Sequence, residues 1–167
     1  MKNNRTLATL EAEIRSKDGS RRERARHELV KMGNVGVPFL MGLLKDTDDH
    51  VRWEACMALS SIGDPGTAPA LVEALTDESV EVQWLAAEAL IALGEKAVPP
   101  LLRGLQAKFN SPYFRQSAHH VLCALERKKK LNSKVMSVLD ALRPMEPRAT
   151  AAIAAKTALD ALRKSHG

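Results

Sequence analysis

Apolar and polar positions along this chain recur in a pattern roughly 30 residues long. Between positions 51 and 62, the apolar residues fall at the three- and four-residue spacing that places side chains on one face of a helix. These residues are Val51, Ala55, Ala58, Leu59 and Ile62. A shorter apolar stripe follows at Leu71 and Leu75. The pattern predicts a helical hairpin over residues 48–75, whose apolar faces need neighbouring units to cover them.

The residues that bound this hairpin recur in phase along the chain. A glycine favours the end of a helix, a proline favours its first turn, and Asp or Ser favours the N-cap. The matched positions are Gly33, Gly63 and Gly94; Pro38, Pro69 and Pro99; Leu44, Leu75 and Leu105; Ala25, Ala55, Ala86 and Ala118; and the N-caps Asp18, Asp48, Ser79 and Ser111. Consecutive copies of one hairpin predict an all-α repeat array.

The phase of these markers divides the 167 residues into units of a single domain. We expect an N-terminal capping helix over 1–17, regular repeats over 18–47, 48–78 and 79–110, a divergent repeat over 111–143 and a C-terminal capping helix over 144–167. The run from Arg127 to Lys130 stands where the glycine turn should be, and we expect a solvated turn there. The last helix, about 148–164, has the core spacing of the first helix of each hairpin and should close the array.

The second repeat resembles the short HEAT-like repeat of phycobilin-lyase-type proteins. The resemblance rests on residues 51–59 (VRWEACMAL), on Gly63-Asp64-Pro65 and on residues 72–75 (VEAL), and it covers nearly the whole chain. It implies a right-handed α-α superhelix, here of about ten helices in five layers. It also implies a ladder in which Arg22 and Arg52 pair with turn acids such as Asp64.

The resemblance further implies that the polar side of each first helix lines an inner, concave surface. Trp53 and Trp84 occupy the same register on this side and are the chain's only tryptophans. Since packed helices lie about 8–10 Å apart, we expect the two indoles to be neighbours. The candidate partner-binding residues are Trp53, Trp84, Met57, Leu85, Glu54, Glu88, His50, Tyr113, Gln116 and His120.

Two interpretations of the tryptophan pair stay open. Trp and Tyr dominate the binding free energy of many protein interfaces, which makes this face a candidate partner site. Alternatively, the indoles shield the seam between adjacent helices and serve only the fold. The sequence does not decide between the two.

Charge is distributed unevenly along the chain, although the net charge is +5. Residues 35–107 hold four Lys/Arg against eleven Asp/Glu, whereas residues 1–34 hold nine against five and residues 108–167 hold twelve against four. A nucleic-acid-binding array needs a continuous basic surface, so the acidic middle argues against that function. It favours a protein partner whose segment is apolar with basic flanks.

The sequence shows no motif of catalysis, metal binding or cofactor binding. It lacks HExxH, a glycine loop for phosphates and a nucleophile elbow. His27-Glu28 resembles the His-Glu pairs of di-iron hydroxylases built on the same repeats, but Met57-Ala58 and Glu88-Ala89 take the equivalent places. We therefore expect no metal and no cofactor. Cys56 and Cys123 lie far apart inside predicted helices, and we expect them to be packed thiols.

These observations together predict a non-enzymatic protein-interaction module. No apolar run approaches the roughly 18 residues of a membrane span, and the first residues do not lead into an apolar signal core. We therefore expect a cytoplasmic protein that does not bind membranes. The resemblance gives one alternative, a bilin lyase subunit or phycobiliprotein-handling factor. A nucleic-acid-binding module, as in DNA glycosylases built on HEAT-like arrays, is the second alternative.

Overall fold

The structure, a computed structural model, describes residues 6–128, 131, 133–142 and 148–164. In these residues it contains ten α-helices and no strand. The α-helices are α1 (Leu7–Ile14), α2 (Gly19–Lys31), α3 (Val37–Leu43), α4 (Asp49–Ile62), α5 (Ala68–Ala74), α6 (Val80–Leu93), α7 (Val98–Ala107), α8 (Pro112–Arg127), α9 (Ser133–Ala141) and α10 (Arg148–Lys164). Three short 3-10 helices, η1 (Gly33–Val35), η2 (Pro65–Thr67) and η3 (Gly94–Ala97), connect α2 to α3, α4 to α5 and α6 to α7.

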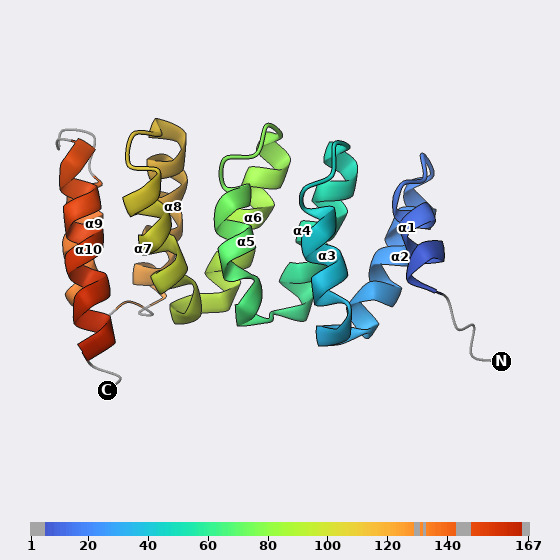
Figure 1. Ribbon diagram of the computed structural model, residues 1–167, viewed down its shortest axis with the longest axis horizontal. Coiled ribbons are helices and arrows are strands. Elements are labelled where there is room, and N and C mark those ends of the chain that lie inside the picture. Colours follow the sequence, from blue (N-terminus) through green and yellow to red (C-terminus); the bar gives the residue numbers. More distant parts are fainter. Residues whose placement is uncertain (1–5, 129–130, 132, 143–147, 165–167) are drawn as a thin grey trace.

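The helices stand side by side in five layers of two (Figure 1). Each layer pairs one odd-numbered helix with the next even-numbered helix, from α1 with α2 to α9 with α10. The first and last layers lie at opposite ends of the array, as expected for a solenoid and not for a closed bundle. The predicted all-α solenoid of about ten helices in five layers is therefore confirmed.

Local sequence determines where the long helices begin and end. The N-cap side chains Asp18, Asp48, Ser79 and Ser111 each accept a hydrogen bond from a backbone N–H in the first turn of the helix that follows. The three turn glycines have positive φ angles of 56°, 68° and 65° at Gly33, Gly63 and Gly94. Residues with a Cβ rarely adopt this conformation, which explains why glycine recurs at this position.

The even-numbered helices from α2 to α8 form one row in which each helix packs directly on the next. The odd-numbered helices from α1 to α7 lie in a second row, and contacts between α1 and α3 and between α3 and α5 are sparser. Fully buried alanines allow the even-numbered helices to approach each other closely. They are Ala25, Ala55, Ala86 and Ala118. A stack with one row more tightly spaced than the other curves with the tighter row on the inside.

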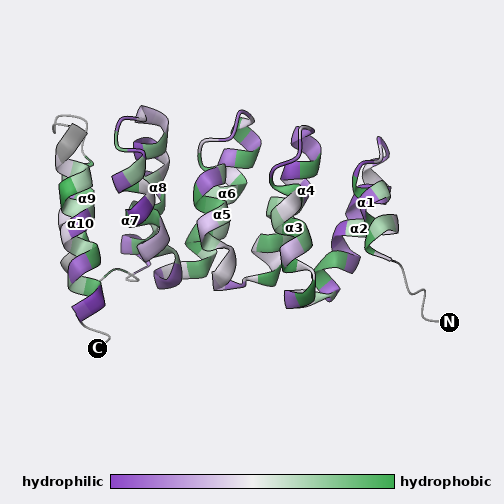
Figure 2. Cartoon of the chain, in the orientation of Figure 1, coloured by the Kyte–Doolittle hydropathy of each residue, from purple (hydrophilic) through white to green (hydrophobic). Residues whose placement is uncertain are grey.

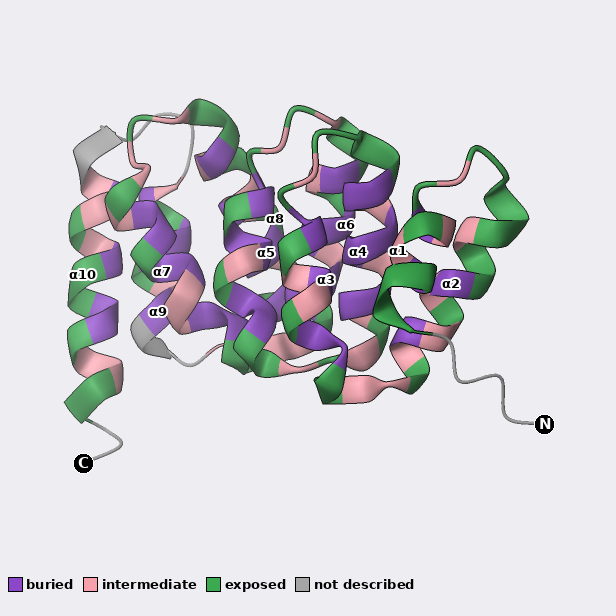
Figure 3. Ribbon diagram, turned by 45° about the vertical axis from the view of Figure 1, so that its right-hand side comes forward, coloured by how far each residue is buried: buried purple, intermediate pink, exposed green. Residues whose placement is uncertain are grey.

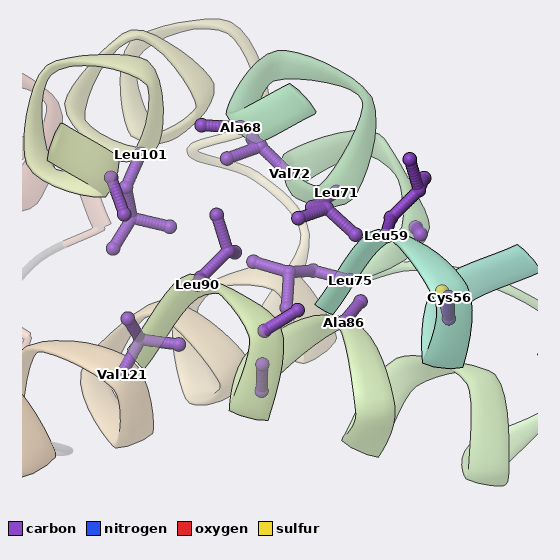
Figure 4. Packing of buried hydrophobic residues seen from close by; sticks show 14 of the residues in the cluster. Cys56, Leu59, Ala68, Leu71, Val72, Leu75, Ala86, Leu90, Leu101 and Val121 are labelled. Carbon is purple, nitrogen blue, oxygen red and sulfur yellow. The ribbon is translucent and has the colours of Figure 1, made fainter. Parts of the chain in front are cut away.

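The hydrophobic core lies between the two rows. Leu71 of α5 and Leu75 at its C-cap meet Leu90 of α6, and Leu101 of α7 and Val121 of α8 continue the cluster into the next layer (Figure 4). Hydrophobic residues interrupt polar ones along every helix (Figure 2), and buried positions follow the sides that face the other row (Figure 3). The core is thus continuous along the array and has no single centre, as expected for a repeat protein.

The last layer departs from the sequence prediction. The core spacing of α10 is that of an even-row helix, yet α10 packs against α7 in the odd row (Figure 3). Helix α9 takes the even-row place, next to α8. The buried residues of α10 include Ala155, Ala158 and Leu159, as predicted. An apolar stripe shows that a helix is covered on one side but does not determine which row covers it. The turn predicted over 127–130 falls partly outside the described residues.

A ladder of side chains ties α2, α4, α6 and α8 each to the turn before it. In four successive repeats, a side chain donates a hydrogen bond to the carbonyl oxygen six residues earlier. The four bonds run from Arg22 to Ser16, from Arg52 to Asp46, from Gln83 to Asp77 and from Arg115 to Phe109. These carbonyl groups lie just after the end of the preceding helix, where backbone acceptors have no hydrogen-bond donor within the helix.

Arg52 of this ladder pairs with Asp77 and Arg22 pairs with Glu54, so the expectation that Asp64 is the paired acid was wrong. The guanidinium of Arg52 binds the Asp77 carboxylate through two hydrogen bonds of 2.7 and 2.8 Å. Asp64 instead caps η2 by accepting a hydrogen bond from the backbone N–H of Gly66. One repeat later, Lys108 occupies the position that corresponds to Asp77, and the neutral Gln83 occupies the ladder position that corresponds to Arg52. The acid and its arginine are therefore lost together.

Acid should weaken the second of these turns, the one that contains Asp46. The hydrogen bond from Arg15, with an ion-pair distance of 2.6 Å, holds the pKa of Asp46 below its ordinary value. A carboxyl whose pKa is lower in the folded than in the unfolded chain stabilises the fold above its unfolded pKa, about 3.9, and loses this contribution as the pH falls through the folded value. Urea unfolding at pH 5 and pH 3 should show the loss, and Arg15→Ala should make it smaller. An unchanged difference in Arg15→Ala would contradict this assignment.

Candidate interaction face

The surface of the even row carries a concentration of exposed apolar side chains. Of the six large apolar side chains exposed in the described part of the chain, three lie on α6 and α8. They are Val80, Trp84 and Tyr113, with 71%, 58% and 69% of their surface exposed. Contiguous exposed aromatic surface has no role in folding and commonly marks a binding site.

These three residues border one cleft between α6 and α8. Its volume is about 350 Å³. The lining residues are Val80, Gln83, Trp84, Ala87, Tyr113, Gln116, Ser117 and His120. We call this the Trp84 cleft. It combines aromatic and aliphatic surface with amide, hydroxyl and imidazole groups, and aromatic residues are enriched at protein interfaces.

The second tryptophan lies in a different cleft of about 350 Å³, which spans the starts of α2, α4 and α6. The lining residues are Arg22, Asp49, His50, Trp53, Glu54, Ser79 and Glu81. Trp53 is only partly exposed. The guanidinium carbon of Arg26 lies 5.7 Å from the centre of its ring, so a cation–π interaction covers part of this indole.

Glu54 and Leu85 were predicted on the exposed face, and the structure buries both. Leu85 is 7% exposed and belongs to the hydrophobic core. Glu54 is 3% exposed, and its carboxylate accepts a 2.8 Å hydrogen bond from Arg26. The Nε atom of Arg22 lies 3.4 Å from its other carboxylate oxygen. The charge of Glu54 is thus balanced by two arginines of the chain at the floor of the Trp53 cleft.

The other predicted residues remain at the surface. His50, Tyr113, Gln116 and His120 are exposed, and Met57 and Glu88 are partly exposed. Val80 and Ser117 also line the Trp84 cleft and were not among the predicted site residues. Register places both on the predicted face, because Val80 matches the exposed Asp49 one repeat earlier and Ser117 directly precedes Ala118 as Leu85 precedes Ala86.

Acidic groups lie beside both clefts. The Nε2 atom of His120 is 3.6 Å from a carboxylate oxygen of Glu88, which links α8 to α6 at the edge of the Trp84 cleft. Beside Trp53, the Nδ1 atom of His50 lies 2.8 Å from a carboxylate oxygen of Asp49. Hydrogen bonding to His50 lowers the pKa of the Asp49 carboxyl. Negative charge on this face favours partners that carry positive charge.

One group of side chains has the composition of a metal site. Ligand atoms of Asp48, Asp49 and His50 lie within 4.8 Å of one another, and all three residues are exposed. However, Asp48 already accepts the N-capping hydrogen bond of α4, and Asp49 contacts the His50 ring. This arrangement explains the cluster as a helix start.

The two cysteines are free thiols. Burial raises the pKa of the Cys56 thiol to about 12. The Cys123 thiol, whose pKa burial also raises, lies 3.5 Å from the Nε2 atom of His119. A raised pKa keeps both thiols protonated and weakly nucleophilic, which agrees with the prediction that they serve packing. Among the described helices, none has the length and apolar character needed to cross a membrane.

Comparison with known proteins identifies the repeat. A family model described as HEAT repeats matches residues 7–90 and again residues 37–123. The structure is similar to the complex of CpcE and CpcF of phycocyanin lyase from Nostoc sp. PCC7120, with 22% identity, a TM-score of 0.50 and coverage of 94% of this chain and 66% of that chain. It also matches an engineered protein at 21% identity and a TM-score of 0.46, covering 93% of this chain and 78% of that one. No curated protein matches the chain.

Proposed function

This chain belongs to the HEAT repeat family, and we propose that it is a non-enzymatic interaction module that binds a protein partner through the even-row face. HEAT repeats commonly mediate protein interactions. The observation that carries the proposal is the Trp84 cleft, where two exposed aromatic side chains and an exposed valine border one opening. The closely packed even row supports a concave shape for this face.

The chemistry of the face favours a partner segment that is apolar with basic flanks. The exposed aromatic rings of Trp84 and Tyr113 offer apolar contact area. Glu88 stands at one side of the Trp84 cleft, and Asp49 and Glu81 line the neighbouring Trp53 cleft. A segment that places apolar side chains against the aromatic residues and basic side chains near these carboxylates would satisfy both.

Fewer observations support the alternative that this chain is a bilin lyase subunit. The likeness to the CpcE and CpcF complex, at 22% identity, concerns the fold, and it assigns no residue of this chain to chromophore chemistry. A bilin lyase subunit would have to bind a bilin or its acceptor protein. Titrating the purified protein with phycocyanobilin, followed by absorbance, tests this directly, and a saturable spectral change would favour the lyase role over the one we propose.

The double variant Trp84→Ala/Tyr113→Ala should weaken partner binding by about 2 kcal/mol or more, because aromatic residues at the centre of an interface carry much of its energy. The measurement is quantitative affinity capture with wild type and variant as baits, followed by titration of the captured partner. Far-UV circular dichroism should show unchanged helicity.

Val35→Ala is the matched control. Val35 is 75% exposed in η1, between α2 and α3, and lies outside the Trp84 cleft. It should bind like the wild type. Equal binding by the double variant would contradict the proposed site.

A further inference from the structure

Trp53 and Trp84 occupy the same register in successive repeats, but an arginine of the chain lies over Trp53 whereas Trp84 is exposed. At Trp53, a guanidinium from the preceding even-row helix lies over the ring, and the same Arg26 donates a 2.8 Å hydrogen bond to the neighbouring Glu54. The protein thus contains an internal example of an arginine held by one indole and one carboxylate. This pairing of a cation–π interaction with an ion pair is a recognised way of binding a guanidinium.

At Trp84 the internal arginine is absent. The residue in the register of Arg26 one repeat later is Cys56, which follows Ala55 as Arg26 follows Ala25. Its thiol is buried and uncharged, because burial raises its pKa to about 12. The residue in the register of Glu54 is the buried Leu85. The third repeat therefore keeps the tryptophan and replaces both the arginine that covers it in the second repeat and the glutamate that binds this arginine.

A carboxylate nevertheless stands close to Trp84. Glu88 follows Trp84 by four residues on α6, so both side chains lie on one helix face. The Glu88 side chain is 43% exposed, and its carboxylate lies 3.6 Å from the His120 ring at the edge of the Trp84 cleft. The exposed ring of Tyr113 borders the same cleft from α8. An aromatic face and an accessible carboxylate are thus present again, this time with no arginine of the described residues over the ring.

We infer that the Trp84 cleft binds an arginine side chain of the partner. The guanidinium lies over the indole of Trp84, beside Tyr113, and pairs with Glu88, as Arg26 does with Trp53 and Glu54. This inference rests on the proposed function and names the residue by which the partner is recognised. Charge complementarity supports it, since the half-exposed carboxylate of Glu88 stands at the edge of the cleft.

The test is a titration of the ¹⁵N-labelled full chain with N-acetyl-arginine methylamide, followed by the two indole N–H signals in NMR spectra. Trp53→Phe and Trp84→Phe assign these signals. The neutral isostere N-acetyl-citrulline methylamide is the matched probe. We expect the Trp84 signal to shift saturably, with at least about fivefold tighter binding of the arginine compound. The Trp53 signal, already covered by Arg26, should shift little.

Glu88→Gln should remove most of the preference for arginine over citrulline, whereas Glu95→Gln, an exposed glutamate in η3, should leave it intact. Equal binding of the two compounds, equal shifts of both indoles, or an unchanged preference in Glu88→Gln would each overturn the inference. The proposed function fails separately. If Trp84→Ala/Tyr113→Ala still binds the partner normally, the face itself is wrong, whatever the arginine titration shows.

Discussion

Replacing Arg52 with alanine is expected to lower the free energy of unfolding by about 3 kcal/mol or more. Its side chain is almost fully buried, pairs twice with Asp77 and donates to the carbonyl oxygens of Asp46 and Thr47. Removing it leaves a buried carboxylate and two backbone acceptors without their donor. Urea unfolding followed by circular dichroism measures the loss.

Two controls distinguish the ion pair from a general effect of removing an arginine. Arg21→Ala removes a 62% exposed side chain and should change the free energy of unfolding by no more than about 0.5 kcal/mol. Arg52→Gln should cost less than Arg52→Ala, since Gln83 makes the same carbonyl contact one repeat later. Equal stabilities of Arg52→Ala and Arg21→Ala would show that the ladder does not stabilise the array.

Gly104→Ala is expected to destabilise the fold by about 2 kcal/mol, near the middle of the range for overpacked cores. A Cβ at this position would lie 2.5 Å from Cζ of Phe114 and 2.8 Å from Cγ1 of Val72. In an unhindered helix the same change would stabilise the protein. Gly42→Ala, near the end of α3, is the matched control, because nothing lies within 4 Å of its added Cβ. Thermal and urea unfolding should show Gly104→Ala to be less stable than the wild type and Gly42→Ala to be more stable.

The cause can be tested by changing both sides of the contact. Phe114 occupies the register that holds Val51 and Val82 in the preceding repeats, and Gly104 occupies that of Leu43 and Ala74. A larger residue on α8 therefore faces a smaller one on α7. In a Phe114→Val background, Gly104→Ala should lose most of its cost, giving a coupling energy of about 1 kcal/mol or more. Additive costs would mean that Phe114 is not what excludes the methyl group.

The sequence was most informative where a local rule applied. The glycine stops and N-caps depend on backbone conformation within one turn, and the structure confirms them at each position. It was least informative where the neighbouring helix decides. The register shared with the second repeat placed Leu85 on the face away from the core, but the helices packed beside α6 bury this leucine. The row occupied by α10 was beyond prediction for the same reason, since one apolar stripe suits either row.

The tryptophan pair shows this limit most clearly. Trp53 and Trp84 have the same register and the same predicted role, yet one is partly covered and the other is 58% exposed. The difference comes from the residue at one shared register of the preceding even-row helix. This residue is Arg26 on α2 for Trp53 and Cys56 on α4 for Trp84. The two open interpretations, seam packing and binding patch, can thus each suit one tryptophan. Only the three-dimensional arrangement distinguishes them.

The central claim is that the even-row face is covered at Trp53 and open at Trp84. Acrylamide quenching of tryptophan fluorescence in Trp53→Phe and Trp84→Phe, each of which keeps a single indole, measures it directly. We predict a clearly larger quenching constant for Trp84 than for Trp53. The constant for Trp84 should not change when the protein is diluted. Equal constants, or a larger constant for Trp53, would contradict the account.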